Sequence, residues 1–202
     1  MRKVFAIGGL TAALLCAGAT AQAEGLSGKA MVQELAKGGY SVFMRHTKTD
    51  NSQKDTDVSN LDNCATQRNL SDAGREQAKA MGEALKVAGA KFGEVFSSPY
   101  CRAIETAKIM FGQGNKHENL SYLTRLPKDK ADAASAWLKA ELAKPVAAGT
   151  NRILISHTAN LKQGTGHWPK DAGDMYVYKA DGKGGYVHVG TVLAADWKAM
   201  VE

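Results

Sequence analysis

Histidine and arginine side chains follow apolar runs at three places in this sequence. Arg45 and His46 end the segment YSVFMRH, Arg102 follows EVFSSPYC, and Ser156 and His157 end NRILISH. A neutral imidazole is a nucleophile that can accept a phosphoryl group. A guanidinium binds a phosphoryl group through paired N–H donors and stabilises the charge of its transition state. Together, these residue types predict phosphoryl-transfer chemistry, provided that the fold brings them to one place.

The segments around these residues alternate between strand and helix patterns. Short apolar runs predict strands over residues 40–45, 94–98, 118–123 and 151–156, and a Gly-rich turn predicts a hairpin over 174–193. Amphipathic patterns predict helices over residues 27–39, 69–89, 99–112 and 129–144. Ser71 is the expected N-cap of the second helix, and Pro99 the expected first residue of the third. This alternation predicts a three-layer α/β/α sandwich with a mainly parallel central sheet.

In open α/β sheets, ligands bind at the carboxyl ends of the strands. Arg45 and His46, Arg102, and His157 each follow a different predicted strand. We therefore expect two arginines and two histidines to converge at this edge of the sheet. The three other histidines show no metal-ligand spacing, and clustered carboxylates are absent from the sequence; these histidines are His117, His167 and His188. The sequence therefore predicts a phosphate-binding site that uses neither a metal nor another cofactor.

Four segments resemble the histidine phosphatase superfamily, which has the phosphoglycerate mutase-like fold. These segments are FMRHTKT, NLSDAGREQAKAMGEAL, FSSPYCRAIETA and ILISHTANL, and they span about residues 40–161 in the superfamily's order. The resemblance implies the same fold and a phosphatase activity that proceeds through a phosphohistidine.

The resemblance also implies a role for each matching residue. It implies that His46 is the nucleophile that becomes phosphorylated, and that Arg45 and Arg102 clamp the phosphate. His157 is similar to the superfamily's second pocket histidine. Thr49 matches a position that often supplies a hydroxyl to the phosphate.

Two departures from the superfamily's pattern affect the expected site. Thr47 stands where the family usually has glycine, so we expect a turn that needs no positive φ, which a β-branched residue would resist. The general acid is the second departure. Arg125 stands where many members have a glutamate, and Thr158 stands where another branch has an aspartate. Of the nearby acids, Glu118 and Asp129, we take Asp129 as the candidate proton donor.

The alternative for Asp129 is that it only caps the helix that follows it. A phosphomonoester with an alkoxide leaving group needs a proton donor, whose contribution is about 10²–10⁴-fold in rate. A substrate with a good leaving group needs less assistance. The superfamily's small phosphohistidine phosphatases resemble this chain in size and in lacking an obvious acid.

The N-terminus has the pattern of a secretory signal peptide over residues 1–23. A basic start, MRK, precedes the apolar stretch VFAIGGLTAALLCAGAT and the small-residue site AQA, so cleavage is predicted after Ala23. The alternative is a transmembrane anchor, but the apolar run is short and rich in small residues. We therefore expect one histidine phosphatase domain over residues 24–202, periplasmic or secreted, without stable membrane insertion after cleavage.

Signal cleavage would leave two cysteines, Cys64 and Cys101. An exported protein meets an oxidising compartment, so an even pair of cysteines predicts a disulfide. The alternative is two buried free thiols.

The composition is that of a mildly basic globular protein. The 202 residues are 44% hydrophobic, with a formal net charge of +6, which loss of Arg2 and Lys3 with the signal peptide lowers by two. A mild positive charge favours anionic substrates. Without an arginine-rich block or interleaved aromatic and basic residues, nucleic acid is not an expected partner. Arg68, Arg75 and Lys48 are interpreted as solvated surface charge, with attraction of an anionic substrate as the alternative.

Taken together, the sequence predicts an exported phosphatase that acts on a small phosphorylated substrate through a phosphohistidine on His46. Among exported members of the superfamily, the lipopolysaccharide core heptose phosphatases share the signal peptide, the short length and the spacing of the motifs. By this resemblance the substrate is an envelope phosphate, such as lipopolysaccharide core heptose phosphate. The alternative is a phosphate-binding or regulatory module of the same fold with little turnover.

Overall fold

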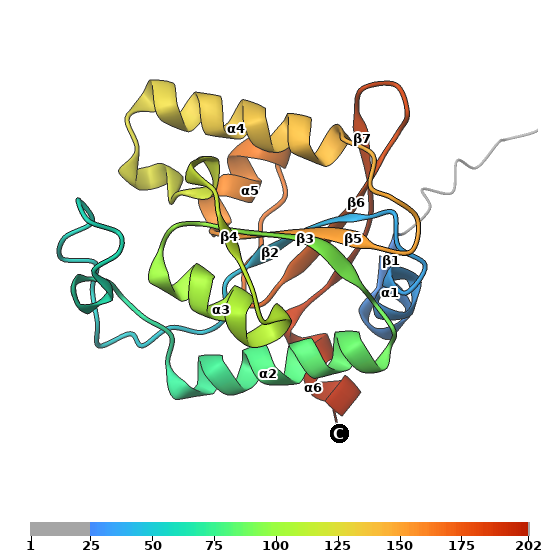
Figure 1. Ribbon diagram of the computed structural model, residues 1–202, viewed down its shortest axis with the longest axis horizontal. Helices are drawn as coiled ribbons and strands as arrows, with labels where there is room; N and C mark the ends of the chain where they lie inside the picture. Colours follow the sequence, from blue (N-terminus) through green and yellow to red (C-terminus); the bar gives the residue numbers. More distant parts are fainter. Residues whose placement is uncertain (1–24, 202) are drawn as a thin grey trace, which may run out of the picture.

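A seven-stranded sheet forms the centre of the protein (Figure 1). The computed structural model describes residues 25–201, so the predicted signal peptide, residues 1–23, lies outside the described part. The spatial order of the strands is β1-β7-β6-β2-β5-β3-β4. Their bounds are β1 (Leu26–Ser27), β2 (Ser41–Arg45), β3 (Phe92–Ser97), β4 (Asn115–Lys116), β5 (Asn151–Ser156), β6 (Met175–Ala180) and β7 (Tyr186–Val192).

The sheet is mainly parallel, as the sequence predicts. β5 pairs in parallel with both β2 and β3, and β4 and β1 add parallel edge strands. The antiparallel pairings come from β6, which lies between β2 and β7. β6 and β7 form the predicted C-terminal hairpin.

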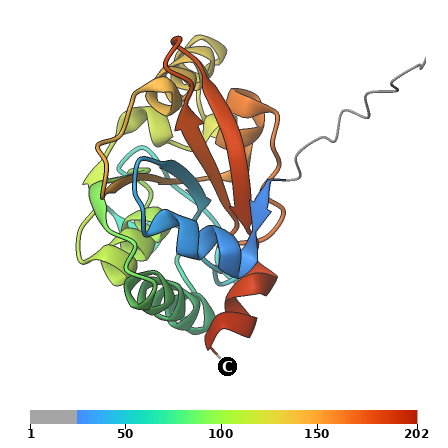
Figure 2. The ribbon, with the colours of Figure 1, turned by 90° about the vertical axis from the view of Figure 1, so that its right-hand side faces the viewer.

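Helices cover both faces of the sheet. Their bounds are α1 (Gly28–Leu35), α2 (Asp72–Val87), α3 (Cys101–Phe111), α4 (Lys128–Ala143), α5 (Thr158–Thr165) and α6 (Ala194–Val201). In Figure 1, α4 and α5 lie above the sheet, and α2, α3 and α6 lie below it. Figure 2 shows α1 beside α6, with which it packs on this lower face. The predicted α/β/α sandwich is thus confirmed.

The two central strands are buried on both faces, which explains their continuous apolar sequences. In β2, Val42 and Met44 belong to the core beneath α1, α2 and α3, whereas Phe43 joins the core beneath α4 and α5. In β5, Ile153 and Leu154 divide between the same two cores. This alternation is expected for a strand with period two inside a sandwich.

The segment after β2 packs closely on the first turn of α2. Ser71 caps this helix by accepting the backbone N–H of Gly74 at 3.1 Å, as the sequence predicts. A Cβ atom on Gly74 would lie 1.9 Å from the carbonyl oxygen of Lys48. Only glycine fits this contact without a shift of the backbone.

Two sequence-based expectations about secondary structure are wrong. Residues 118–123 do not form a strand; the short strand β4 lies before them, and a 3₁₀ turn occupies Glu118–Leu120. The side chain of His117 accepts the N–H of Asn119, which favours that turn over an extended chain. Pro99 is not the first residue of α3, because Tyr100, in an extended conformation, is its N-cap. The short elements β1, α5 and α6 were not predicted.

No helix in residues 25–201 combines the length and the apolar character needed to span a lipid bilayer.

Candidate active site

The ends of β2, β5 and β3 lie side by side, and the residues that follow them are joined by backbone hydrogen bonds. His46 donates its N–H to the carbonyl oxygen of Ser156 at 3.1 Å, and Ser98 donates its N–H to that of Ile155 at 2.8 Å. The ring centroids of His46 and His157 are 5.3 Å apart. The fold therefore brings the two predicted histidines together at the carboxyl edge of the sheet, as expected for this topology.

His46 is held in one tautomer by its neighbour. Its Nδ1 lies 2.8 Å from the backbone oxygen of Thr47. Because a carbonyl oxygen can only accept, Nδ1 carries the proton and Nε2 has a free lone pair. The side chain is 4% exposed, and this burial lowers its pKa to about 3, with a further contribution from the charge of Arg102. His46 is thus a neutral imidazole at neutral pH, the form in which an imidazole can act as a nucleophile.

His157 is also neutral and tightly held. It is 2% exposed, and burial lowers its pKa well below the ordinary value, as do the neighbouring His46 and Arg102. Its Nε2 lies 2.8 Å from the hydroxyl oxygen of Ser98, which also accepts the backbone N–H of Tyr100. The ring of Tyr100 packs edge-on against the imidazole. These contacts orient a second hydrogen-bonding imidazole toward the site.

Arg102 is the most enclosed cation of the site. It lies on the first turn of α3, its side chain is 1% exposed, and its guanidinium lies 4.6 Å from the ring centroid of Tyr100. Nη1 donates to the carboxylate of Asp55 at 3.1 Å and approaches the backbone oxygen of Arg68 at 3.4 Å. A buried guanidinium of this kind keeps its charge and presents donors in a fixed plane.

Arg68 is a site residue that the sequence interpretation assigned to solvated surface. It is half-buried, and its charge contributes to lowering the pKa of both His46 and His157. Within residues 25–201, the Nε atoms of Arg68 and Arg102 are both buried and lack a hydrogen-bond partner. A buried donor without a partner costs about 1–3 kcal/mol. Arg68 lies in a segment without periodicity, so its sequence carried no signal for this role.

Arg45 completes a set of three arginines. Its Nη1 donates to the backbone oxygen of Lys170, and its charge contributes to lowering the pKa of both His46 and His157. Burial lowers the pKa of Arg45 itself, but arginine stays protonated at neutral pH. Thr49 lines a surface cavity together with Arg45 and forms no hydrogen bond with either histidine. Its contact with phosphate stays a prediction.

Thr47 takes the place of the expected glycine without strain. Within the described residues, a positive φ occurs only at glycines, so the turn after His46 needs none, as predicted. Thr47 is fully buried, and its N–H donates to the hydroxyl of Thr106 on α3. A hydroxyl side chain therefore ties this turn to the helix that carries Arg102.

The carboxylate that pairs with the guanidinium of Arg102 is Asp55, a residue that the sequence did not single out. Asp129 is exposed on the first turn of α4 and makes no hydrogen bond with the site residues. Pro127 occupies the N-cap of α4, so the alternative role of Asp129 as N-cap is wrong. Glu118 is exposed in its 3₁₀ turn. The role of Asp129 as proton donor stays a prediction.

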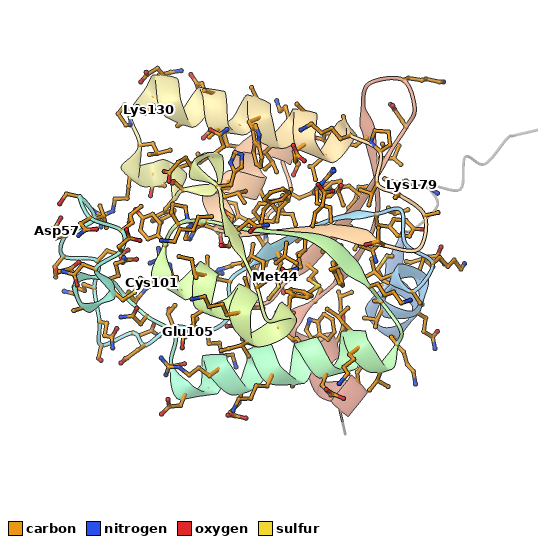
Figure 3. All side chains as sticks on the ribbon, viewed as in Figure 1. Met44, Asp57, Cys101, Glu105, Lys130 and Lys179 are labelled. Atoms are coloured by element: carbon orange, nitrogen blue, oxygen red, sulfur yellow. A yellow bond between two sulfur atoms is a disulfide. The ribbon has the colours of Figure 1, made fainter. Side chains whose placement is uncertain are left out.

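A disulfide ties the long loop after β2 to the start of α3. Cys64 and Cys101 are bonded, with their Cα atoms 5.7 Å apart, which confirms the predicted pairing. Gln67 reinforces the connection, because its Oε1 accepts the backbone N–H of Cys101 at 3.0 Å. In Figure 3, Cys101 marks the helix end of this connection, and Asp57 lies farther out on the loop. The disulfide is thus adjacent in sequence to Arg102.

The described residues contain no cluster of metal-ligating side chains. Between residues 25 and 201, no three His, Cys, Asp or Glu side chains come close enough together to hold an ion.

Neutral imidazoles surrounded by arginines at the carboxyl edge of an α/β/α sandwich define a class of phosphate-binding, phosphatase-like proteins. The sequence model of the histidine phosphatase superfamily (branch 1) matches residues 41–126. Among curated proteins, none matches this chain. The family model covers less than half of the chain, so this match and the shared fold show a likeness to the histidine phosphatase superfamily.

Solved structures of phosphatases share the fold at low sequence identity. The protein histidine phosphatase SixA, complexed with tungstate, is 17% identical with a TM-score of 0.54, over 78% of this chain and 98% of that chain. Phosphoserine phosphatase from Entamoeba histolytica, in complex with phosphoserine, is 16% identical with a TM-score of 0.51, over 78% and 98%. A mycobacterial glucosyl-3-phosphoglycerate phosphatase, with inorganic phosphate, is 18% identical with a TM-score of 0.52, over 77% and 98%.

Proposed function

We propose that this protein is an exported phosphatase that hydrolyses a phosphomonoester through a phosphohistidine on His46. The observation that carries the proposal is the convergence of two imidazoles, His46 and His157, both held neutral beside the buried guanidinium of Arg102. A guanidinium stabilises the charge that spreads over the phosphoryl oxygens in the transition state.

The tautomer of His46 sets the direction of attack. Nε2 has the free lone pair, because Nδ1 donates to the backbone oxygen of Thr47. Attack of Nε2 on phosphorus breaks the bond to the leaving-group oxygen and gives the phosphohistidine. Water then attacks phosphorus, and the P–N bond breaks to release phosphate and restore His46. The three arginines and His157 hold the phosphoryl oxygens in both steps.

The proposed substrate is an envelope phosphate, such as a phosphorylated heptose of the lipopolysaccharide core. The signal-peptide pattern of residues 1–23 and the disulfide Cys64–Cys101 both fit a protein that works in an oxidising compartment. The structural neighbours do not identify the substrate, because their names differ: a protein histidine phosphatase, a phosphoserine phosphatase and a glucosyl-3-phosphoglycerate phosphatase.

Replacement of the nucleophile tests the chemistry. In the protein of residues 24–202, His46→Gln should lower hydrolysis of p-nitrophenyl phosphate by about 10³-fold or more, since the covalent route is lost. Wild-type protein quenched in base should carry one phosphoryl group on His46, detected by mass spectrometry. His188→Gln, which changes an exposed histidine, is the control and should leave the rate unchanged.

The same assay also distinguishes a phosphatase from a phosphate-binding module with little turnover. Undiminished hydrolysis by His46→Gln would remove this residue from the reaction. Binding of phosphate or vanadate by the wild type, without phosphate release from any of a panel of phosphomonoesters, would favour the binding module.

The envelope location and substrate are tested separately. N-terminal sequencing of the exported protein should begin at Glu24, and uncleaved protein in the cytoplasmic fraction would contradict export. In the panel, a lipopolysaccharide core heptose phosphate should have the highest kcat/KM. A higher value for phosphoserine or phosphohistidine would contradict the envelope substrate but leave the phosphatase activity intact.

A further inference from the structure

Asp55 places a carboxylate directly on the predicted phosphate clamp. Its side chain is 8% exposed, and its Oδ1 accepts Nη1 of Arg102 at 3.1 Å. The same Oδ1 accepts the backbone N–H of Arg68 at 2.9 Å. Both residues of the unpartnered Nε pair therefore hold this one carboxylate. Arg102 also lies close enough to His46 to lower the pKa of that imidazole.

The two oxygens of Asp55 have different surroundings. Oδ1 accepts both hydrogen bonds, whereas Oδ2 has no hydrogen-bond partner among residues 25–201 and is not among the fully buried unpartnered atoms. The carboxyl group is therefore fixed in orientation by one oxygen, while the other stays open to carry a proton. A positioned acid requires this combination of a fixed group and a free proton site.

The loop around Asp55 is ordered by its own hydrogen bonds. Thr56 donates its N–H to the backbone oxygen of Thr66 at 2.8 Å, and the Thr66 hydroxyl donates to the backbone oxygen of Asp57 at 2.8 Å. The disulfide at Cys64 ties the same loop to α3. Asp55 is thus held at the clamp from several directions, as a catalytic group must be.

We propose that Asp55 is the general acid that protonates the leaving-group oxygen, an inference that rests on the proposed phosphatase function. A bound phosphoryl dianion engages the arginines and places negative charge beside Asp55, which favours the protonated form. Substrate binding therefore brings a proton to Asp55.

The proton completes both steps of the reaction. When Nε2 of His46 bonds to phosphorus, the P–O bond breaks, and its electron pair takes the proton from Asp55 Oδ2, which leaves a neutral alcohol and a carboxylate. When water attacks the phosphohistidine, that carboxylate accepts the proton of the water as the P–N bond breaks. Phosphate leaves, and both His46 and Asp55 return to their starting states.

A series of leaving groups distinguishes an acid from other roles of Asp55. p-Nitrophenolate leaves readily without a proton, whereas an alkoxide does not. In Asp55→Asn, kcat/KM for glycerol 3-phosphate should fall by about 10²–10³-fold, and kcat/KM for p-nitrophenyl phosphate by less than about tenfold. Asp57→Asn is the matched control, because Asp57 is exposed on the same loop and accepts from Ser59 instead of an arginine. It should leave both substrates unaffected.

Proton uptake by Asp55 can also be measured during phosphate binding, without any catalytic turnover. Inorganic phosphate should bind the wild type with uptake of a proton, seen as a buffer-dependent binding enthalpy, and this uptake should be reduced in Asp55→Asn. Circular dichroism and phosphate binding by Asp55→Asn confirm that the variant is folded.

Each contrary outcome assigns a different role. An equal loss for both substrates would make Asp55 a positioning residue, and a gain for both would make it a competitor of phosphate for Arg102. A leaving-group-dependent loss in Asp129→Asn in place of Asp55→Asn would identify Asp129 as the donor. Wild-type protein that hydrolyses neither substrate would instead overturn the phosphatase function itself.

Discussion

The hydroxyl of Thr106 accepts the backbone N–H of Thr47 at 3.3 Å and lies 3.1 Å from the Thr47 hydroxyl. Thr106 in turn donates to the backbone oxygen of Arg102 at 2.7 Å. One buried side chain thus joins the turn after His46 to the helix that carries Arg102. The spacing between His46 and Arg102 depends on this bridge.

Loss of the bridge should affect both stability and rate. Thr106→Val keeps the shape but leaves the N–H and hydroxyl of Thr47 without their acceptor, so the free energy of unfolding should fall by about 1–3 kcal/mol. kcat/KM for p-nitrophenyl phosphate should fall by about tenfold or more, because the reacting groups are less well aligned. Urea unfolding and steady-state kinetics check the two effects. A variant that loses stability at full activity would show that the bridge does not position the site.

Arg68 should contribute to phosphate binding. Arg68→Gln removes a charge-assisted donor, worth about 1.5–3 kcal/mol, so the inhibition constant for phosphate should rise by about 10- to 100-fold. Arg75→Gln is the matched control, since Arg75 is paired at the surface with Glu105 and Asp72. Equal effects of the two substitutions would reduce the role of Arg68 to general electrostatic attraction.

The two buried neutral histidines should make the fold sensitive to acid. Both have a pKa that is lowered in the folded state, whereas the unfolded chain protonates histidine near pH 6.5. Stability is therefore complete above about pH 6.5. It falls as the pH drops toward 3, by about 1.4 kcal/mol per pH unit for His46, and the lowered pKa of His157 adds a loss in the same direction.

Removal of one histidine should lessen this dependence. Between pH 7 and pH 5, the free energy of unfolding of His46→Gln should gain about 2 kcal/mol relative to the wild type. Urea unfolding at a series of pH values measures the difference. If the difference in free energy of unfolding between the variant and the wild type did not change with pH, His46 would not be buried as a neutral group.

The disulfide should stabilise both the fold and the site. Its cysteines are 37 residues apart, so the double change Cys64→Ala and Cys101→Ala should cost about 4 kcal/mol in the chain-entropy model. The wild type should lose the same stability in dithiothreitol, and the variant should be insensitive to the reductant. Limited proteolysis should cut the variant first within residues 50–63. Identical cleavage patterns would show that hydrogen bonds alone order this loop.

Periodic segments made the fold predictable. β2 and β5 are continuous apolar runs that end at functional residues, and Ser71 caps α2 where its pattern begins. His46 and His157 directly follow β2 and β5, and parallel neighbouring strands end at the same edge of a sheet. The convergence of the two histidines could therefore be expected from the topology. The elements missed are short, such as α5, whose eight residues give little periodicity.

The loop residues of the site could not be predicted from sequence. Asp55 and Arg68 belong to a polar segment of low regularity, where position is decided by a disulfide and by individual hydrogen bonds. Such contacts join residues that do not lie on one face of a helix or strand, so no periodic pattern in the sequence reveals them. Asp129 lies near the position in the sequence where the superfamily usually has its acid. The carboxylate that contacts Arg102 belongs instead to Asp55, which precedes Arg102 in the chain.

The site draws its residues from two parts of the molecule with different resistance to local opening. His46 follows β2, which is paired on both sides in the middle of the sheet, so its position persists until the whole domain unfolds. Asp55 belongs to a loop outside the sheet, which a disulfide, the pair with Arg102 and individual hydrogen bonds hold in place. The proposed nucleophile therefore shares the stability of the sheet, whereas the proposed acid depends on contacts that can open locally.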